Sequence, residues 1–176
     1  MTLSTADFLK TPRARQYGVA LRPEVAADLP FLQALYRSTR EAELDQTQWP
    51  EAQKAQFIDL QFRAQRSHYL QHYPDAVWLI LEKEGNAIGR LFLERWSTEH
   101  RIIDIALLPR WRGQGIGQAL LLDVIDEAMS AGKAVGIHVE KQNPAMSLYL
   151  RLGFRCVEDK GVYDLLRLPA GLSPLG

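Results

Sequence analysis

Apolar residues recur at helical spacing in two stretches of the first half of the chain. The first follows Asp28, which fits an N-cap, and the second opens at Pro50 and ends before Pro74. Proline is favoured in the first turn of a helix, so the pattern predicts two helices joined by a polar link over residues 41–49. Their expected apolar faces are Leu29, Leu32, Leu35 and Tyr36 in the first helix, and Ala55, Phe57, Ile58, Phe62, Tyr69 and Leu70 in the second.

Strand-sized apolar or alternating runs, bounded by Gly, Pro and Asn, dominate the rest of the chain. An amphipathic run over residues 115–131 interrupts them and predicts a helix that Gly132 closes. A shorter helix is predicted over 143–152, ended by Gly153. The predicted strands cover residues 17–22, 77–83, 87–96, 100–108 and 134–139, followed by a hairpin over 154–168 that turns at Gly161. The pattern is typical of a mixed α/β fold.

Length and composition place these elements in one domain. The chain has 176 residues, of which 47% are hydrophobic and 24% charged, values typical of a globular protein. We expect a flexible arm over 1–16, one domain over 17–168 and a tail over 169–176. No apolar run has the length of a membrane span or a signal peptide, so the expectation is a cytoplasmic protein without a membrane partner.

Charge and cysteine content exclude several functions. Lys plus Arg and Asp plus Glu are both 21, and a net charge of zero argues against a nucleic-acid partner. The single cysteine, Cys156, cannot form an internal disulfide or a cysteine metal cluster. His68 and His72 are four residues apart, but Tyr69 stands where a zincin has glutamate, so no metal is expected.

A glycine-rich turn carries the clearest chemical signal. The sequence Leu-Leu-Pro-Arg-Trp-Arg-Gly-Gln-Gly-Ile-Gly-Gln-Ala-Leu over residues 107–120 runs from a predicted strand into a helix N-terminus. Such a turn lets backbone N–H groups converge on phosphate oxygens, and Arg112 can add a charged contact. The letters fit neither the dinucleotide fingerprint, which needs Gly or Ala where Leu120 stands, nor a P-loop, which needs Gly-Lys followed by Ser or Thr.

A second sequence motif lies farther along the chain, and together with the glycine turn it forms a known pattern. The first block reads Arg112-x-x-Gly115-x-Gly117, and the second reads Asn143, then Ala145-x-x-Leu148-Tyr149-x-x-x-Gly153-Phe154. In order and in placement on elements, the two resemble the GNAT family, the Gcn5-related N-acetyltransferases that use acetyl-CoA. The resemblance covers roughly residues 77–168.

This resemblance implies a fold and a mode of acetyl-CoA binding. The fold is a twisted, mostly antiparallel sheet of about seven strands with one splayed parallel pair, flanked by about four helices. The pantetheine arm would lie in the splay, the pyrophosphate on the glycine turn, and the sulfur near the hydroxyl of Tyr149. The implied binding residues are Ile105, Ala106, Leu107, Leu108, Arg112, Gly113, Gln114, Gly115, Ile116, Gly117, Gln118, Asn143, Ala145 and Tyr149.

Direct acyl transfer needs a neutral amine, donors that polarise the thioester carbonyl, and an acid for the departing thiolate. A main-chain N–H near Leu107 or Leu108 would serve as the donor, and Tyr149 as the acid; the alternative for Tyr149 is a core aromatic residue. Asp104 is the preferred base and Glu99 the second. Alternation of side chains along the strand puts Asp104 on the face opposite Ile103. Glu94 and His138 are further candidates for the base, and any one of these groups can instead be a solvated or paired charge.

The sequence thus predicts an N-acetyltransferase that moves an acetyl group from acetyl-CoA to a primary amine of a small molecule or a protein. The alternative is a non-catalytic module that senses acyl-CoA. The oligomeric state, monomer or homodimer, is left open. Candidate acceptor contacts come from the front of the chain: Arg40, Glu43, Trp49 and Tyr69.

Overall fold

The structure is a computed structural model that describes residues 9–171. Strands and helices follow the order that the hydrophobic pattern predicts. The helices are α1 (Pro12–Gln16), α2 (Leu29–Asp45), α3 (Glu51–His72), α4 (Ile116–Ser130) and α5 (Met146–Arg151), with short 3-10 turns η2 (Ala26–Asp28) and η3 (Pro109–Trp111). The strands are β1 (Val19–Pro23), β2 (Val77–Lys83), β3 (Asn86–Arg95), β4 (Glu99–Leu107), β5 (Ala134–Glu140), β6 (Arg155–Lys160) and β7 (Tyr163–Leu168).

All seven strands join one open sheet in the order β1-β2-β3-β4-β5-β7-β6. Every neighbouring pair is antiparallel except β4 and β5, which run parallel because α4 crosses from the end of one to the start of the other. The predicted mixed sheet with one parallel pair is therefore confirmed. Five α-helices accompany it over residues 9–171, one more than expected.

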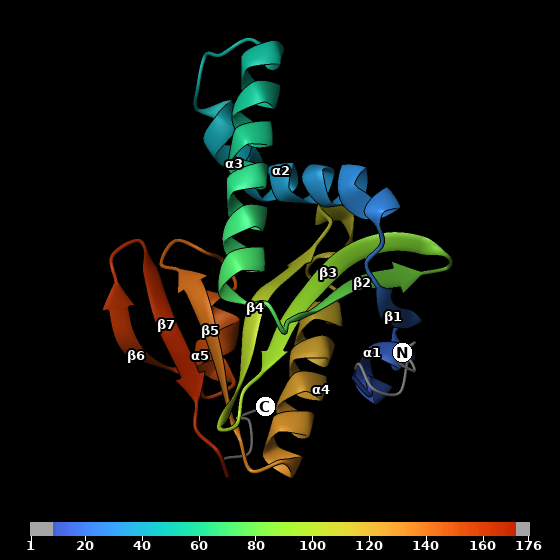
Figure 1. Cartoon of the computed structure of the whole chain (residues 1–176), viewed down its shortest axis with the longest axis vertical. Helices are drawn as coiled ribbons and strands as arrows, with labels where there is room; N and C mark the ends of the chain where they lie inside the picture. The colour runs from blue at the N-terminus through green and yellow to red at the C-terminus, as the bar shows by residue number, and fades with distance from the viewer. Residues whose placement is uncertain (1–8, 172–176) are drawn as a thin grey trace.

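Helices cover the two faces of the sheet (Figure 1), and an apolar core lies on each face. The larger core packs α4 and α5 against one face, with Leu120, Val124 and Tyr149 among its buried residues. The smaller core packs α2 and α3 against the other face, around Leu32, Phe62 and Phe92. The first half of α3 and the link from α2 extend beyond the sheet (Figure 1).

The first described residues differ from the flexible arm predicted over 1–16. Pro12–Gln16 form α1, because proline suits the first turn of a helix, where no N–H is needed. Asp123 of α4 accepts hydrogen bonds from the N–H groups of Arg13 (3.1 Å) and Ala14 (3.0 Å), which satisfies donors at the start of α1. Ala14 is fully buried, so α1 is packed on the domain. Residues 1–8 and 172–176 lie outside the described residues.

Helix α2 runs to Asp45, so the predicted link over 41–49 shortens to residues 46–50. Two ion pairs within the helix support its last turns: Arg37 with Glu41 at 3.3 Å, and Arg40 with Glu43 at 3.0 Å. Leu44 adds a buried contact to the smaller core. The sequence pattern did not predict the last turn of α2 because Leu44 is the only apolar residue among its polar neighbours.

Candidate active site

Strands β4 and β5 separate partway along their length. They pair from Glu99 with Ala134 to Ile102 with Ile137, and no pair follows although β4 continues to Leu107 and β5 to Glu140. A bulge in β4 accompanies the separation: Phe92 of β3 faces Asp104 and Leu93 faces Ile102, which leaves Ile103 without a partner. Bulges bend a strand and redirect its side chains. The splay implied by the resemblance is thus present.

Main-chain groups line the β4 side of this gap. The N–H of Leu108 donates to the carbonyl of Ile88 on β3 at 2.8 Å, so the groups of Leu108 point away from β5. Because backbone groups alternate along a strand, those of Leu107 and Ile105 point into the gap and those of Ala106 point toward β3. Of the four residues predicted to bind pantetheine through their main chain, Ile105 and Leu107 have the required orientation.

The glycine turn lies at the end of β4 and leads into α4. Gly113 (φ 71°) and Gly115 (φ 89°) are left-handed, a conformation that costs glycine little. Gly115 is the N-cap of α4, and Gly117 lies in the first turn, where the nearest atom to an added Cβ would be Leu107 Cδ1 at 3.9 Å. The turn therefore presents backbone N–H groups at a helix N-terminus with room for an anion.

Two side chains hold the turn in place. Gln114 Nε2 donates to the carbonyl of Arg110 at 2.7 Å. Arg112 Nε donates to the carbonyl of Leu107 at 2.9 Å, and its Nη2 reaches Ser38 Oγ of α2 at 3.2 Å. Arg112 thus links the turn, the gap and the helix layer.

Gly115 faces Tyr17 rather than open space. A Cβ at this position would lie 2.7 Å from the Tyr17 hydroxyl, and the positive φ would strain any other residue. A hollow of about 210 Å³ lies beside this contact, lined by Tyr17, Arg13 and Gln118 among others. A bulky residue at Gly115 would consequently disturb α1 packing as well as any phosphate site, so Gly117 is the cleaner position to probe.

Tyr149 lies on α5, next to the gap, with its ring edge-on to Phe154 at 5.6 Å between centroids. Its side chain is buried. Burial, followed by the nearby Asp104 carboxylate, raises the pKa of Tyr149 above its usual value. The phenol therefore stays protonated at neutral pH, as a proton donor must.

Asp104 is the acidic residue that the bulge brings to this gap. Alternation predicts that it lies opposite Ile103, but the bulge places both on the α2–α3 side: Ile103 packs in the smaller core while Ile105 packs in the larger. Asp104 forms an ion pair with buried Arg90 of β3. Burial raises the pKa of the Asp104 carboxyl above its ordinary range, although Arg90 opposes the shift.

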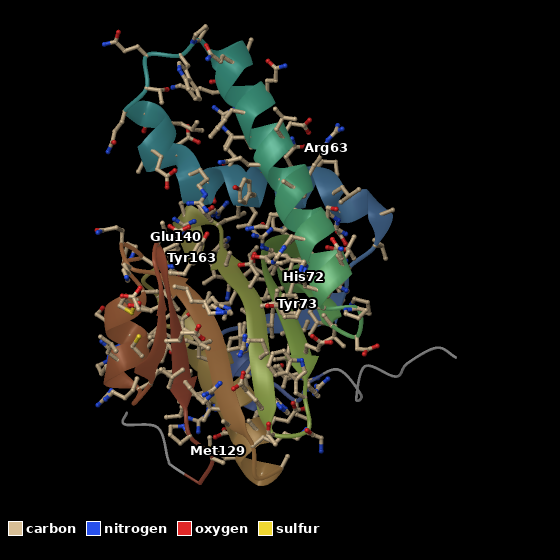
Figure 2. All side chains as sticks on the ribbon, turned by 60° about the vertical axis from the view of Figure 1, so that its left-hand side comes forward. Arg63, His72, Tyr73, Met129, Glu140 and Tyr163 are labelled. Atoms are coloured by element: carbon tan, nitrogen blue, oxygen red, sulfur yellow. The ribbon has the colours of Figure 1, made fainter. Side chains whose placement is uncertain are left out.

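Two predicted acceptor contacts, Arg40 and Tyr69, lie near Asp104. The carboxylate is among the causes that raise the pKa of Tyr69, after burial. Arg40 forms an ion pair with Glu140 at the end of β5 at 2.8 Å, and Glu140 accepts a hydrogen bond from the Tyr163 hydroxyl at 3.2 Å. Figure 2 shows Glu140 and Tyr163 together at the end of the sheet nearest the helix layer.

Other predicted residues lie elsewhere. Glu99 is at the start of β4, where its two oxygens accept from Arg101 and Arg167, both at 2.7 Å. Trp49 is in the link between α2 and α3, with its ring 5.2 Å from that of Phe57. Glu43 is largely exposed on α2.

Of the remaining candidates, Asn143 precedes α5, which begins only at Met146 and is shorter than predicted. The side-chain Oδ1 of Asn143 accepts from the N–H of Ala145 at 2.8 Å, which stabilises this turn. His138 and Glu94 were weaker candidates for the base: burial lowers the pKa of His138, and Glu94 is a buried residue paired with Arg101 in the β3–β4 register.

Sequence reasoning missed Arg90 and Glu140. Arg90 interrupts the apolar run of β3 on the same face as Phe92, and a charge on a buried face is a signal of function that can be found in the sequence. Glu140 ends β5 without any such signal. Its role depends on the tertiary contact with α2.

A comparison with protein families identifies the family of this chain. Residues 32–154, more than half of the chain, match the model of the Acetyltransferase (GNAT) family. The chain belongs to this family.

Curated relatives share a smaller part of the chain. Cysteine-rich protein 2-binding protein of Mus musculus is 34% identical over 87 residues, which are 49% of this chain and 11% of that protein. A Bacillus subtilis (strain 168) protein provisionally named [ribosomal protein bS18]-alanine N-acetyltransferase is 28% identical over 90 residues, which are 50% of this chain and 60% of that protein. The aligned segments thus span under two thirds of these relatives.

Solved structures share the fold. The PaiA N-acetyltransferase of Thermoplasma acidophilum, solved in complex with coenzyme A, has a TM-score of 0.65 at 19% identity and covers 86% of this chain and 98% of its own. The ribosomal-protein-S18-alanine N-acetyltransferase of Escherichia coli has a TM-score of 0.58 at 20% identity and covers 88% of this chain and 96% of its own. Within residues 9–171, no helix combines the length and apolar character needed to cross a membrane.

Proposed function

We propose that this protein binds acetyl-CoA between β4 and β5 and transfers the acetyl group directly to a primary amine of a small molecule or a protein. The observation that carries the proposal is the gap beyond Ile102 and Ile137, which the glycine turn adjoins. An opening in a sheet releases main-chain donors and acceptors from strand pairing, and these need other partners. Here the Ile105 N–H donates to the Asp104 carboxylate and the Leu107 carbonyl accepts from Arg112, side-chain contacts that a ligand can replace. The family membership and the named relatives support the same activity.

The residues around the gap fit the parts of CoA. Main-chain groups of Ile105 and Leu107 are placed to pair with the amides of a pantetheine arm. The N–H groups at the start of α4, the open space at Gly117 and the guanidinium of Arg112 suit a pyrophosphate. Arg112 would exchange its contacts with Leu107 and Ser38 for the ligand.

The chemistry follows from the protonation states of two groups. Acetyl-CoA supplies the acyl group as a thioester. Asp104 accepts a proton from the acceptor ammonium or amine, directly or through water, and its raised pKa makes it a better base than an ordinary aspartate. The N–H of Leu107 polarises the thioester carbonyl, and the neutral amine nitrogen attacks the carbonyl carbon. As the carbon–sulfur bond breaks, Tyr149 donates its proton to the sulfur, which leaves the amide product and CoA.

Binding and turnover test this proposal separately. CoA at about 100 times its dissociation constant should add roughly 2.7 kcal/mol to the free energy of unfolding, measured by thermal denaturation, whereas NADH should not. A panel of amines with acetyl-CoA, followed by mass spectrometry, should reveal an acetylated product. A melting curve that millimolar CoA leaves unchanged would refute the proposal, and CoA binding without turnover on any amine would favour the acyl-CoA sensor.

A further inference from the structure

Arg40 is a largely buried arginine that spans the mouth of the gap. Its side chain is 18% exposed and reaches from α2 to Glu140 at the end of β5, with Nη2 2.8 Å from Oε1. Its Nη1 meets Glu43 at 3.0 Å, and the guanidinium lies 5.7 Å from the centre of the Tyr36 ring. The pair with Glu140 thus closes the gap between the helix layer and the sheet, past the point where β4 and β5 separate.

Donors near this mouth lack acceptors. Among residues 9–171, the buried Nε atoms of Arg40 and Arg90 have no hydrogen-bond partner, and the acceptor Oδ2 of Asp104 meets Arg90 as an ion pair only. Arg90 is 3% exposed and is held by Asp104, while Glu140 takes only one nitrogen of Arg40 along the Nε–Nη2 edge. A guanidinium edge binds both oxygens of a carboxylate at once, so this edge is half used.

The charges at the mouth of the gap also indicate which charges the acceptor molecule carries. Two arginines, Arg40 and Arg90, face two largely buried carboxylates, Asp104 and Glu140, while the third carboxylate on Arg40, that of Glu43, is 64% exposed and screened by solvent. A polyamine would require an excess of carboxylates. A molecule with an amine and a carboxylate close together instead matches both signs.

We propose that the acceptor is a small amino-carboxylate, such as an α-amino acid, whose carboxylate takes the Nε–Nη2 edge of Arg40 while its amine lies at Asp104. This inference rests on the proposed function and specifies its acceptor. Glu140 is displaced from Arg40 and keeps its hydrogen bond from the Tyr163 hydroxyl. Arg40 is therefore a specificity-determining residue.

The test compares each L-α-amino acid with its primary amide, and adds putrescine and a peptide amide as amines without a nearby carboxylate. Wild-type protein saturated with acetyl-CoA should use at least one amino acid with kcat/KM about tenfold or more above that of its amide. In Arg40→Met, that value should fall about 30-fold or more, mainly through KM, and the ratio of kcat/KM between the amino acid and its amide should fall to about one. Arg40→Lys keeps the charge and loses the fork, so it should retain part of the preference.

A matched control is Arg37→Met, one turn earlier on α2. Arg37 pairs with Glu41 and Glu51 within the helix layer, so this variant should keep the preference for the carboxylate. The inference is overturned if amides, putrescine or the peptide are used as well as amino acids, or if Arg40→Met lowers all acceptors equally.

Calorimetry on the CoA-loaded protein separates this inference from the proposed function. Preferential binding of an amino acid over its amide, lost in Arg40→Met, would uphold the inference even if no acetyl group were transferred. Acetyl transfer without a carboxylate preference would overturn the inference and leave the proposed function intact.

Discussion

Each end of β4 carries a carboxylate paired with arginine, but the hydrogen bonding around the two pairs differs. At the start, where β4 pairs with β5, Glu99 is 4% exposed and both of its oxygens are held by arginines at 2.7 Å. At the end, where the strands have separated, Asp104 pairs with Arg90, yet Arg90 retains a buried Nε without a partner among residues 9–171. One strand therefore holds two acid–arginine groups that differ in whether their hydrogen bonds are complete.

Under the proposed function, this difference separates a structural ion pair from one that takes part in catalysis. Complete pairing at a closed part of a sheet stabilises the native state and leaves nothing for a ligand. Incomplete pairing costs stability, and beside an open part of the sheet it leaves polar groups that a ligand can complete. Under the proposed function, the hydrogen bonds around each buried carboxylate distinguish Asp104 from Glu99, which residue type alone does not.

The largest expected effect lies at the open end. Asp104→Asn combined with Arg90→Gln removes both members of the pair, which spares the fold the cost of one buried unpaired charge. Turnover at saturating acetyl-CoA should fall about 10³-fold, within the range for loss of a general base. The midpoint of thermal unfolding should change little. An active double variant would reduce Asp104 to a structural residue like Glu99.

The converse change is at the closed end. Glu99→Gln leaves Arg101 and Arg167 without their carboxylate, and Arg101 is itself buried. Loss of one member of a buried pair should lower the free energy of unfolding by about 3 kcal/mol, measured by urea denaturation. Turnover per folded molecule should match that of wild type. A large loss of turnover at full stability would move the base from Asp104 to Glu99.

Hydrophobic periodicity predicted most of the helices and strands. Their order along the chain follows from runs of Ile, Val and Leu and from glycines at the ends of elements, whereas the mostly antiparallel sheet with one parallel pair was implied by the family resemblance. The extension of α2 to Asp45 was missed because ion pairs and a single leucine support it. The packing of α1 was missed because it depends on Asp123, more than a hundred residues away.

The sequence predicted some residues of the candidate site and missed others. The glycine turn and Tyr149 lie in short motifs that can be read locally. The face of the sheet on which Asp104 lies depends on a bulge in β4, which a strictly alternating pattern does not predict. The ion pair of Arg40 with Glu140 depends on how α2 packs near the end of β5. Residues that act through tertiary contacts leave little local signal.

A smaller effect is expected at Tyr149, which completes the open end. Phenylalanine keeps the ring and its edge contact with Phe154 but removes the hydroxyl. Tyr149→Phe should lower turnover about 10²-fold, because the departing thiolate loses its acid, with CoA affinity and melting temperature retained. An acyl donor with a more acidic thiol should reduce the defect. Wild-type turnover in this variant on acetyl-CoA would return Tyr149 to a packing role.

The smallest expected effects come from two glycines, one at each end of the comparison. At Gly136, opposite the start of β4, an added Cβ would collide with the Glu99 carboxylate, while at Gly117 the nearest atom is 3.9 Å away. Gly136→Ala should therefore lower stability and leave CoA affinity unchanged.

Gly117→Val should leave stability nearly unchanged and lower CoA affinity about tenfold, or about 1.4 kcal/mol by calorimetry, because the branched side chain fills space meant for the phosphates. Equal CoA affinity in wild type and Gly117→Val would show that the open space at the start of α4 has another use.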